Sequence, residues 1–148
     1  MSALPVLPES PPADTGAHLF EVHDKVGLIQ AAPIVVDWLG KCAKASAGRY
    51  DIRYLGESHF SWWILADAHL LAIAVSEEVE HPSGERWLSL LFAAGRSVQL
   101  WLPHFADFRR IAKDRGCVGI ECVVRKGFAP KLIGLGMRET GRLLEVRV

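Results

Sequence analysis

The sequence predicts an α/β (α+β) fold, with a mixed, largely antiparallel central sheet, one parallel β-α-β crossover and flanking helices. Residues 86–92 and 119–124 read as apolar strands with a long amphipathic helix between them. A strand, a helix and a strand at this spacing form a right-handed crossover between parallel strands. Residues 60–66, 70–75 and 86–92 follow one another through short turns, which indicates antiparallel neighbours.

The first part of the chain predicts an arm, a strand and a helix. Residues 1–17 hold four prolines among small and acidic residues, so we expect a flexible arm or, alternatively, a docking tail that a partner orders. Residues 18–23 alternate briefly and predict a first strand. Pro33 stands near a helix start, and apolar residues recur at helical spacing from there until Gly48. A short helical turn is expected within residues 49–58.

The middle of the chain predicts a strand followed by a hairpin. Residues 60–66 carry two adjacent tryptophans, one for each face of a strand, and a turn follows at 67–68. Residues 70–75 are almost wholly apolar, and the acidic residues after them indicate that the far end of this strand reaches solvent or lines a cleft. His-Pro-Ser-Gly at 81–84 is a strong turn signal, which joins this strand to residues 86–92 as an antiparallel hairpin.

The long helix has a single apolar stripe. Trp101, Phe105, Phe108 and Ala112 recur at steps of four, three and four residues, which keeps them on one side. We therefore expect the helix to lie on the sheet. Gly116 stands where a helix usually ends in a left-handed residue.

Two stretches in the last third of the chain resemble a known family. Residues 127–139 predict a short helix that leads into Leu-Gly-Met-Arg-Glu, and residues 142–148 read as a closing strand. Residues 112–128 read Ala-Lys-Asp-Arg-Gly-Cys-Val-Gly-Ile-Glu-Cys-Val-Val-Arg-Lys-Gly-Phe. Together they resemble the C-terminal end of the GNAT acyltransferase superfamily, and residues 112–128 are similar to the small GNAT-like proteins of bacteriophages and prophages. The similarity runs from about Ser58 to the end of the chain.

This resemblance implies where a coenzyme would bind. In GNAT enzymes, a glycine-rich turn after the strand and the N-terminus of the following helix hold the pyrophosphate of coenzyme A through backbone N–H groups. Acetyl-CoA is therefore the cofactor that the resemblance implies, and no metal is expected. The corresponding turn keeps one glycine and one cation, and its members are Ala93, Ala94, Gly95, Arg96 and Ser97.

The resemblance leaves the acid–base residues open. The tyrosine that protonates the leaving thiolate in many GNAT enzymes is replaced here by Leu132. If the protein acetylates an amine, a carboxylate or a histidine at the cleft takes the amine proton, and the candidates are Glu77, Glu78 and His81. Acidic residues at a strand end beside a turn are also common as solvated groups.

Composition bounds the remaining possibilities. Half of the 148 residues are hydrophobic and five are tryptophan, so we expect one GNAT-like domain at residues 18–148. No apolar run reaches the roughly 20 residues that a membrane helix needs, and the N-terminus does not resemble a signal peptide. We therefore expect no membrane partner and a location in the host bacterial cytoplasm or in a virion.

Charge is distributed unevenly along the chain. Residues 1–100 hold 7 Lys or Arg against 12 Asp or Glu, and residues 101–148 hold 10 against 5. The basic last third can hold an anionic ligand such as a nucleotide phosphate, or it forms the solvated face of the long helix. A nucleic-acid binder would carry a larger net positive charge, so nucleic acid is not an expected partner.

Two functions compete. The missing glycines and Leu132 favour a catalytically degenerate GNAT fold that serves a phage as a virion, assembly or host-interaction protein, with phage structural or host proteins as partners. The alternative is an acyl-CoA-dependent N-acetyltransferase with an amine acceptor. In that case the coenzyme lies between the strands that end at Ala93 and begin at Val118.

Overall fold

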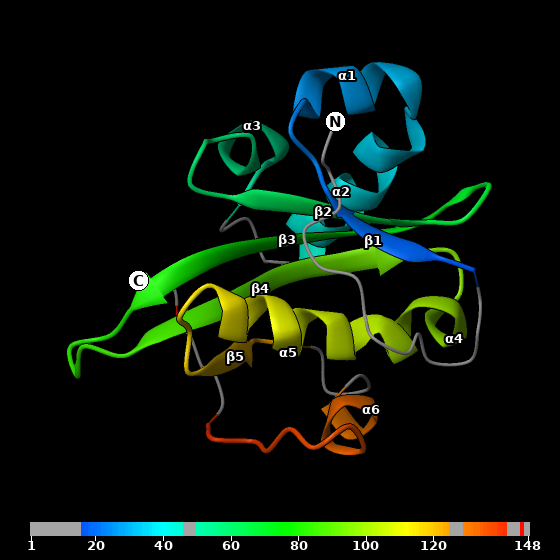
Figure 1. Cartoon of the computed structure of the whole chain (residues 1–148). Helices are drawn as coiled ribbons and strands as arrows, with labels where there is room; N and C mark the ends of the chain where they lie inside the picture. The colour runs from blue at the N-terminus through cyan, green and yellow to red at the C-terminus, as the bar shows by residue number, and fades with distance from the viewer. Residues whose placement is uncertain (1–15, 46–49, 125–128, 142–145, 147–148) are drawn as a thin grey trace.

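The structure, a computed structural model, describes residues 16–45, 50–124, 129–141 and 146. Within these ranges, one sheet holds five strands in the order of the sequence (Figure 1). Neighbouring strands are antiparallel except the last pair, which is parallel. The predicted fold class is therefore confirmed. The strands are β1 (His18–Glu21), β2 (Ser61–Ala66), β3 (Leu70–Glu80), β4 (Arg86–Gly95) and β5 (Gly119–Cys122).

Helices cover both faces of this sheet (Figure 1). One face, here called the α2 side, carries α1 (Lys25–Ala31), α2 (Ile34–Ala45) and α3 (Ile52–Leu55). The opposite face, the α5 side, carries α4 (Val98–Trp101) and α5 (Phe105–Asp114). The short helix α6 (Ala129–Ile133) follows β5.

The helices at the start of the chain were predicted only in part. The helix expected from Pro33 is confirmed as α2, and α3 lies in the expected stretch 49–58. Helix α1 was not predicted because it is short, contains Gly27 and buries no residue completely, although the Asp24 carboxylate caps it by accepting from the Gly27 N–H. Among the described residues, no single helix is long and apolar enough to cross a membrane; α1 and most of α2 pass that test only as a joined pair bent by 113°.

The two adjacent tryptophans of β2 belong to opposite sides of the sheet, as the alternation predicted. Trp62 packs on the α2 side and donates its indole N–H to the Leu55 carbonyl at 2.8 Å. Trp63 packs on the α5 side and donates to the Ser76 hydroxyl at 2.9 Å. The sheet therefore separates two hydrophobic cores. The buried members on the α2 side are Val35, Trp38, Leu39, Leu55, Phe60, Trp62, Ile73 and Val75. Those on the α5 side are Ala17, Leu19, Trp63, Leu65, Leu71, Ala72, Ala74, Leu88, Phe108, Ile111, Ala112 and Cys117.

The β3–β4 hairpin forms as predicted, but β4 is longer than expected. The Gly84 N–H donates to the His81 carbonyl in the turn, where Gly84 has a φ of +87° that favours glycine. Strand β4 continues to Gly95, where a Cβ would lie 2.4 Å from the Leu71 carbonyl oxygen. The predicted turn at residues 93–97 is therefore wrong in its extent, because pairing with β3 holds its first three residues in the sheet.

The predicted long helix is interrupted. Its first turn is α4, a 3₁₀ helix follows at Leu102–His104, and α5 begins only at Phe105. Pro103 explains the break, because proline has no N–H to donate and its ring displaces the carbonyl four residues earlier. The apolar stripe nevertheless faces the sheet, since Phe108 and Ala112 are buried in the core on the α5 side.

The ends of the fold agree with the prediction where the structure describes them. Gly116 has a φ of +77° just after α5, so the predicted helix end is confirmed. Strand β5 is two residues shorter than the expected 119–124. The predicted closing strand at 142–148 and the predicted arm at 1–17 lie outside the described residues, apart from three positions. Of these, Ala17 is completely buried on the α5 side.

Candidate functional site

The candidate site begins where β4 and β5 part. The two parallel strands pair from Trp87 and Gly119 to Leu90 and Cys122, and β4 then continues to Gly95 without a described partner on that edge. The strands thus start together and separate at their carboxyl ends. The sequence predicted the coenzyme between these two strands, taken as ending at Ala93 and beginning at Val118, and its binding there stays a prediction.

A β-bulge lies at the point of separation. Val75 of β3 pairs with Phe92 and Ser76 pairs with Leu90, so Leu91 is an extra residue of β4. Leu91 also lies just past the last residue of β4 that pairs with β5. Bulges of this kind disrupt the hydrogen-bond ladder and are common beside active sites. The bulge therefore puts the backbone of Leu91 beside the point where β4 and β5 part.

The residues predicted to hold the coenzyme lie beside this gap. Ala93, Ala94 and Gly95 pair with β3, while Arg96 donates its N–H to the Leu71 carbonyl at 2.9 Å and its Nε–H to the Leu70 carbonyl at 3.1 Å. The Ser97 hydroxyl bonds the side chain of Gln99. Helix α4 has only four residues, so its dipole is small. Coenzyme binding by these five residues stays a prediction.

The structure separates the three predicted catalytic residues. Glu78 pairs with Leu88, a core residue of the α5 side, whereas its neighbour Glu77 pairs with Ser89 and faces the α2 side. Glu121 of β5 pairs with Ser89 in turn. Glu77, Ser89 and Glu121 therefore form one row across three strands on the α2 side, here called the carboxylate row.

Each carboxylate of the row faces an imidazole. His81 Nε2 lies 2.5 Å from Glu121 Oε1, and His59 Nε2 lies 3.9 Å from Glu77 Oε2. The side chains of His81 and Glu121 are 39% and 40% exposed, so solvent and ligands reach this pair. A hydrogen-bonded acid and imidazole can take up a proton from a bound substrate. The structure thus brings His81 and Glu77 to one surface and adds Glu121.

Sequence reasoning missed Glu121 as a site residue. It is the one charged residue of the strand 119–124, where apolar neighbours predict burial. A charge at such a position is itself a signal, but only the pairing of β5 with β4 shows that Glu121 meets His81. Its carboxylate also affects the next residue, because burial and then the Glu121 charge raise the pKa of the Cys122 thiol.

Glu78 belongs to a different arrangement. It bonds Arg86 across the hairpin and lies 3.5 Å from Arg115, whose other nitrogen lies 2.9 Å from Glu21. The Arg115 guanidinium also lies 5.0 Å from the ring centre of Trp63. These contacts tie β1, β3, β4 and the end of α5 together on the α5 side. Glu78 is paired with cations there and is not at the candidate site.

The basic residues of the long helix also divide. Arg115 takes part in these ion pairs, whereas Arg109 and Lys113 are exposed on α5 and Arg110 is half-buried. The exposed pair agrees with the interpretation of a solvated helix face.

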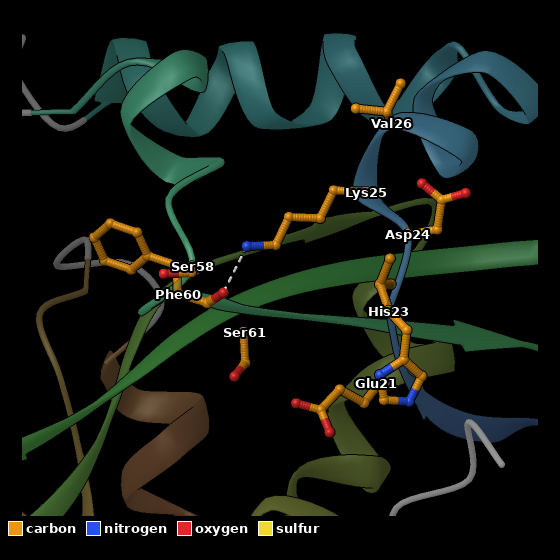
Figure 2. A pocket seen from close by; sticks show the side chains of 9 residues that line it. Glu21, His23, Asp24, Lys25, Val26, Ser58, Phe60 and Ser61 are labelled. Atoms are coloured by element: carbon orange, nitrogen blue, oxygen red, sulfur yellow. Dashed lines mark hydrogen bonds between the residues drawn. The ribbon is translucent and has the colours of Figure 1, made fainter. Parts of the chain in front are cut away.

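A separate pocket of about 360 Å³ lies beside the ends of β1 and β2 (Figure 2). Lys25 reaches across it, and its ammonium donates to the carbonyls of Phe60 at 2.7 Å and Glu57 at 3.0 Å. Burial lowers the pKa of Lys25, and the Glu57 charge counteracts part of that effect. The lysine therefore serves to fix the start of β2. The pocket is lined by Glu21, Val22, His23, Asp24, Lys25, Val26, Ser58, Phe60 and Ser61.

The histidines do not converge on a metal. His69 precedes β3 and His81 follows it, so the two lie at opposite ends of that strand, and His59 faces Glu77. Across the described ranges, no three His, Cys, Asp or Glu side chains are grouped so that they could hold a metal ion.

Comparison by sequence finds no relative: no family model and no curated protein matches the chain. Comparison by structure finds solved chains of similar fold. A transcriptional regulator from Bacillus halodurans C-125 superposes with a TM-score of 0.64 at 13% identity, over 88% of this chain and 100% of its own. An acetyltransferase from Trypanosoma brucei gives 0.62 at 12% identity, over 89% and 99%. A predicted acetyltransferase from Clostridium acetobutylicum, solved with acetyl-CoA, gives 0.62 at 15% identity, over 88% and 96%.

These matches show the fold. The chain has the mixed sheet and flanking helices of GNAT acetyltransferases over nearly nine-tenths of its length. The resemblance seen in the sequence is thereby confirmed at the level of the fold. None of the matches bears on a phage or prophage origin, which stays a prediction.

Proposed function

We propose that this GNAT-fold protein is an acyl-CoA-dependent N-acetyltransferase that transfers an acetyl group to an amine. One observation carries the proposal: β4 and β5 part at the bulged Leu91, and Glu121, one residue before the last pair of these two strands, meets His81 from the end of β3. The acetyltransferases of the same fold support this choice over the degenerate phage protein that the sequence favoured.

The chain fits acetyl-CoA at the thioester end of the ligand. Leu91 has no register partner on either neighbouring strand, and we propose that its backbone contacts the thioester carbonyl oxygen in the gap. The pyrophosphate end of the ligand has a weaker site. Three residues of the predicted turn belong to β4 and pair with β3, and α4 is short. Acetyl-CoA would supply an activated acetyl group as a thioester.

The carboxylate row supplies the group that accepts a proton from the amine. As the amine nitrogen forms a bond to the acetyl carbon and the carbon–sulfur bond breaks, the Glu121 carboxylate accepts the proton that the nitrogen loses. His81 holds Glu121 in place through the 2.5 Å contact and passes the proton to solvent through its half-exposed ring. Leu132 is buried on α6 and has no proton to give, so the thiolate leaves without a donor at that position.

The first experiment measures acetyl-CoA binding and turnover in the same protein. Acetyl-CoA at about 100 times its dissociation constant should stabilise the fold by roughly 2.7 kcal/mol, seen as a higher unfolding midpoint. Release of free coenzyme A with an amine present should then fall about 10²- to 10³-fold in Glu121→Gln. That variant should keep the acetyl-CoA shift, because the carboxylate acts on the acceptor.

Glu80→Gln is the matched control, since Glu80 is an exposed carboxylate of the same hairpin with its side chain away from the row. It should leave turnover unchanged. Gly95→Asp is unsuitable as a test of coenzyme binding, because a Cβ at this position would lie 2.4 Å from the Leu71 carbonyl oxygen and the variant would test folding. If acetyl-CoA leaves the midpoint unchanged, the proposal fails and a repurposed binding fold takes its place.

A further inference from the structure

We infer that the acceptor is a cationic amine with an aromatic or other flat apolar group, recognised by Tyr54 and His59 together with Glu77. This inference rests on the proposed function and deepens it, since it names the class of acceptor. It comes from a set of aromatic side chains on the α2 side that the transfer chemistry does not use.

The aromatic side chains form a connected cluster, here called the aromatic wall, made of Tyr50, Tyr54, His59 and Phe60. Tyr50 and Tyr54 stack with ring centres 5.8 Å apart, and Tyr54 meets His59 at 5.9 Å. Phe60 is 2% exposed, and its ring contacts both tyrosines edge to face. Tyr54 itself is 45% exposed. The wall therefore offers an accessible ring on a rigid base.

The wall joins the two parts of the candidate site. At one end His59 lies beside Glu77, the first member of the carboxylate row. At the other end Tyr50 packs against Phe92 with ring centres 5.6 Å apart, and Phe92 follows the bulged Leu91 directly. A ligand on the wall thus lies between the row and the point where β4 and β5 part.

The carboxylates on this surface favour a cation. Glu77 and Glu121 face the α2 side, each beside an imidazole, while the guanidinium groups of Arg86 and Arg115 bond Glu78 on the opposite side. The ammonium of Lys25 is held by backbone carbonyls at the start of β2. A cation gains from the carboxylates and from the face of an exposed tyrosine, whereas an anion would be repelled.

The test uses three probes that share one ring and differ in charge: phenethylamine, 2-phenylethanol and 3-phenylpropionate. Their binding is measured by isothermal titration and by NMR on the full chain without acetyl-CoA. We expect phenethylamine to bind about three- to tenfold more tightly than 2-phenylethanol, as for partly exposed charge pairs, and 3-phenylpropionate to bind most weakly.

Two sets of variants locate the site. Glu77→Gln should weaken phenethylamine about threefold or more and leave 2-phenylethanol unchanged, whereas the control Glu80→Gln should change neither. Tyr54→Ala should weaken both probes, and Tyr54→Phe, which keeps the ring, should restore them. Because the Asp51 carboxylate caps α3 at the backbone N–H of residue 54, neither substitution removes that cap.

Equal binding of the three probes, or equal effects of Glu77→Gln and Glu80→Gln, would overturn the inference. Because these measurements omit acetyl-CoA, they are independent of the test of transfer. Selective binding of phenethylamine without an acetyl-CoA shift would remove the proposed transfer and keep the cation-selective surface. A higher unfolding midpoint with acetyl-CoA, without selective binding of phenethylamine, would keep the proposed transfer and remove the cation-selective surface.

Discussion

Glu77 and Glu78 are neighbours in β3, but their carboxylates lie on opposite sides of the sheet and have different partners there. Glu78 lies on the α5 side, between Arg86 and Arg115, in ion pairs that link strands to a helix. Glu77 lies on the α2 side, where it faces the half-exposed imidazole of His59.

The difference in partners separates a carboxylate held in ion pairs from one that can take part in proton transfer. A guanidinium is always charged, so a carboxylate that it binds stays ionised and serves the fold. An imidazole changes its charge near neutral pH, so an acid beside it can share and release protons. Under the proposed function, the α5 side serves stability and the α2 side exchanges protons with a ligand, and three pairs of substitutions test that contrast.

The largest expected effect comes from the glycines on the two sides. In Gly95→Ala the new methyl would meet the Leu71 carbonyl at 2.4 Å, a backbone atom that cannot move away, so we expect a loss of about 2 kcal/mol. In Gly119→Ala it would meet the outer edge of the Trp87 ring at 2.6 Å, which can swing aside, so the loss should stay below about 1 kcal/mol. Urea unfolding measures both, and equal losses would contradict the contrast.

A smaller effect is expected from the charged partners. Arg115→Met removes the bonds to Glu21 and Glu78 and the contact with Trp63, which should cost about 1 kcal/mol. His81→Gln loses one half-exposed contact with Glu121 and should change stability by less than about 0.5 kcal/mol. Unfolding in low and high salt checks this, because salt should narrow the gap between Arg115→Met and the wild type. A gap that salt leaves unchanged would point to lost packing.

The smallest effect concerns the thiols beside the two acids. Burial raises the pKa of both Cys117 and Cys122, and the next cause is Glu78 for the first thiol and Glu121 for the second. Since only the thiolate reacts, Glu121→Gln should speed the alkylation of Cys122 by iodoacetamide at pH 8, and Glu78→Gln should speed that of Cys117. Tandem mass spectrometry distinguishes the two sites. A crossed result, with each variant acting on the other thiol, would contradict the assignment of sides.

The sequence predicted the elements far better than the site. Hydrophobic spacing located β2, β3 and α2, and turn residues located the β3–β4 hairpin and the end of α5 at Gly116. Helix α1 was missed because Gly27 lowers its propensity and no residue of it is fully buried. The break at Pro103 was missed because the apolar stripe continues across it.

The candidate site was predicted only in fragments. Glu77 and His81 were named, but Glu78 was grouped with them although adjacent strand residues point to opposite faces; which of the two faces the site only the pairing of the strands shows. Glu121 was missed because its partner His81 lies 40 residues away in the chain. The predicted coenzyme-binding turn, residues 93–97, included too many residues, because pairing with β3 extends β4 to Gly95.

The sequence alone determined what depends on near neighbours: the order of the elements, the amphipathic faces and the points where helices and turns end. Steric limits on glycine and proline and the alternation of apolar residues act within a few positions, so they can be read directly. Only the tertiary structure decided the bulge at Leu91, the parting of β4 from β5 and the meeting of Glu121 with His81. These depend on the register between strands distant in sequence, and a shift of one residue in register exchanges the two sides of a sheet.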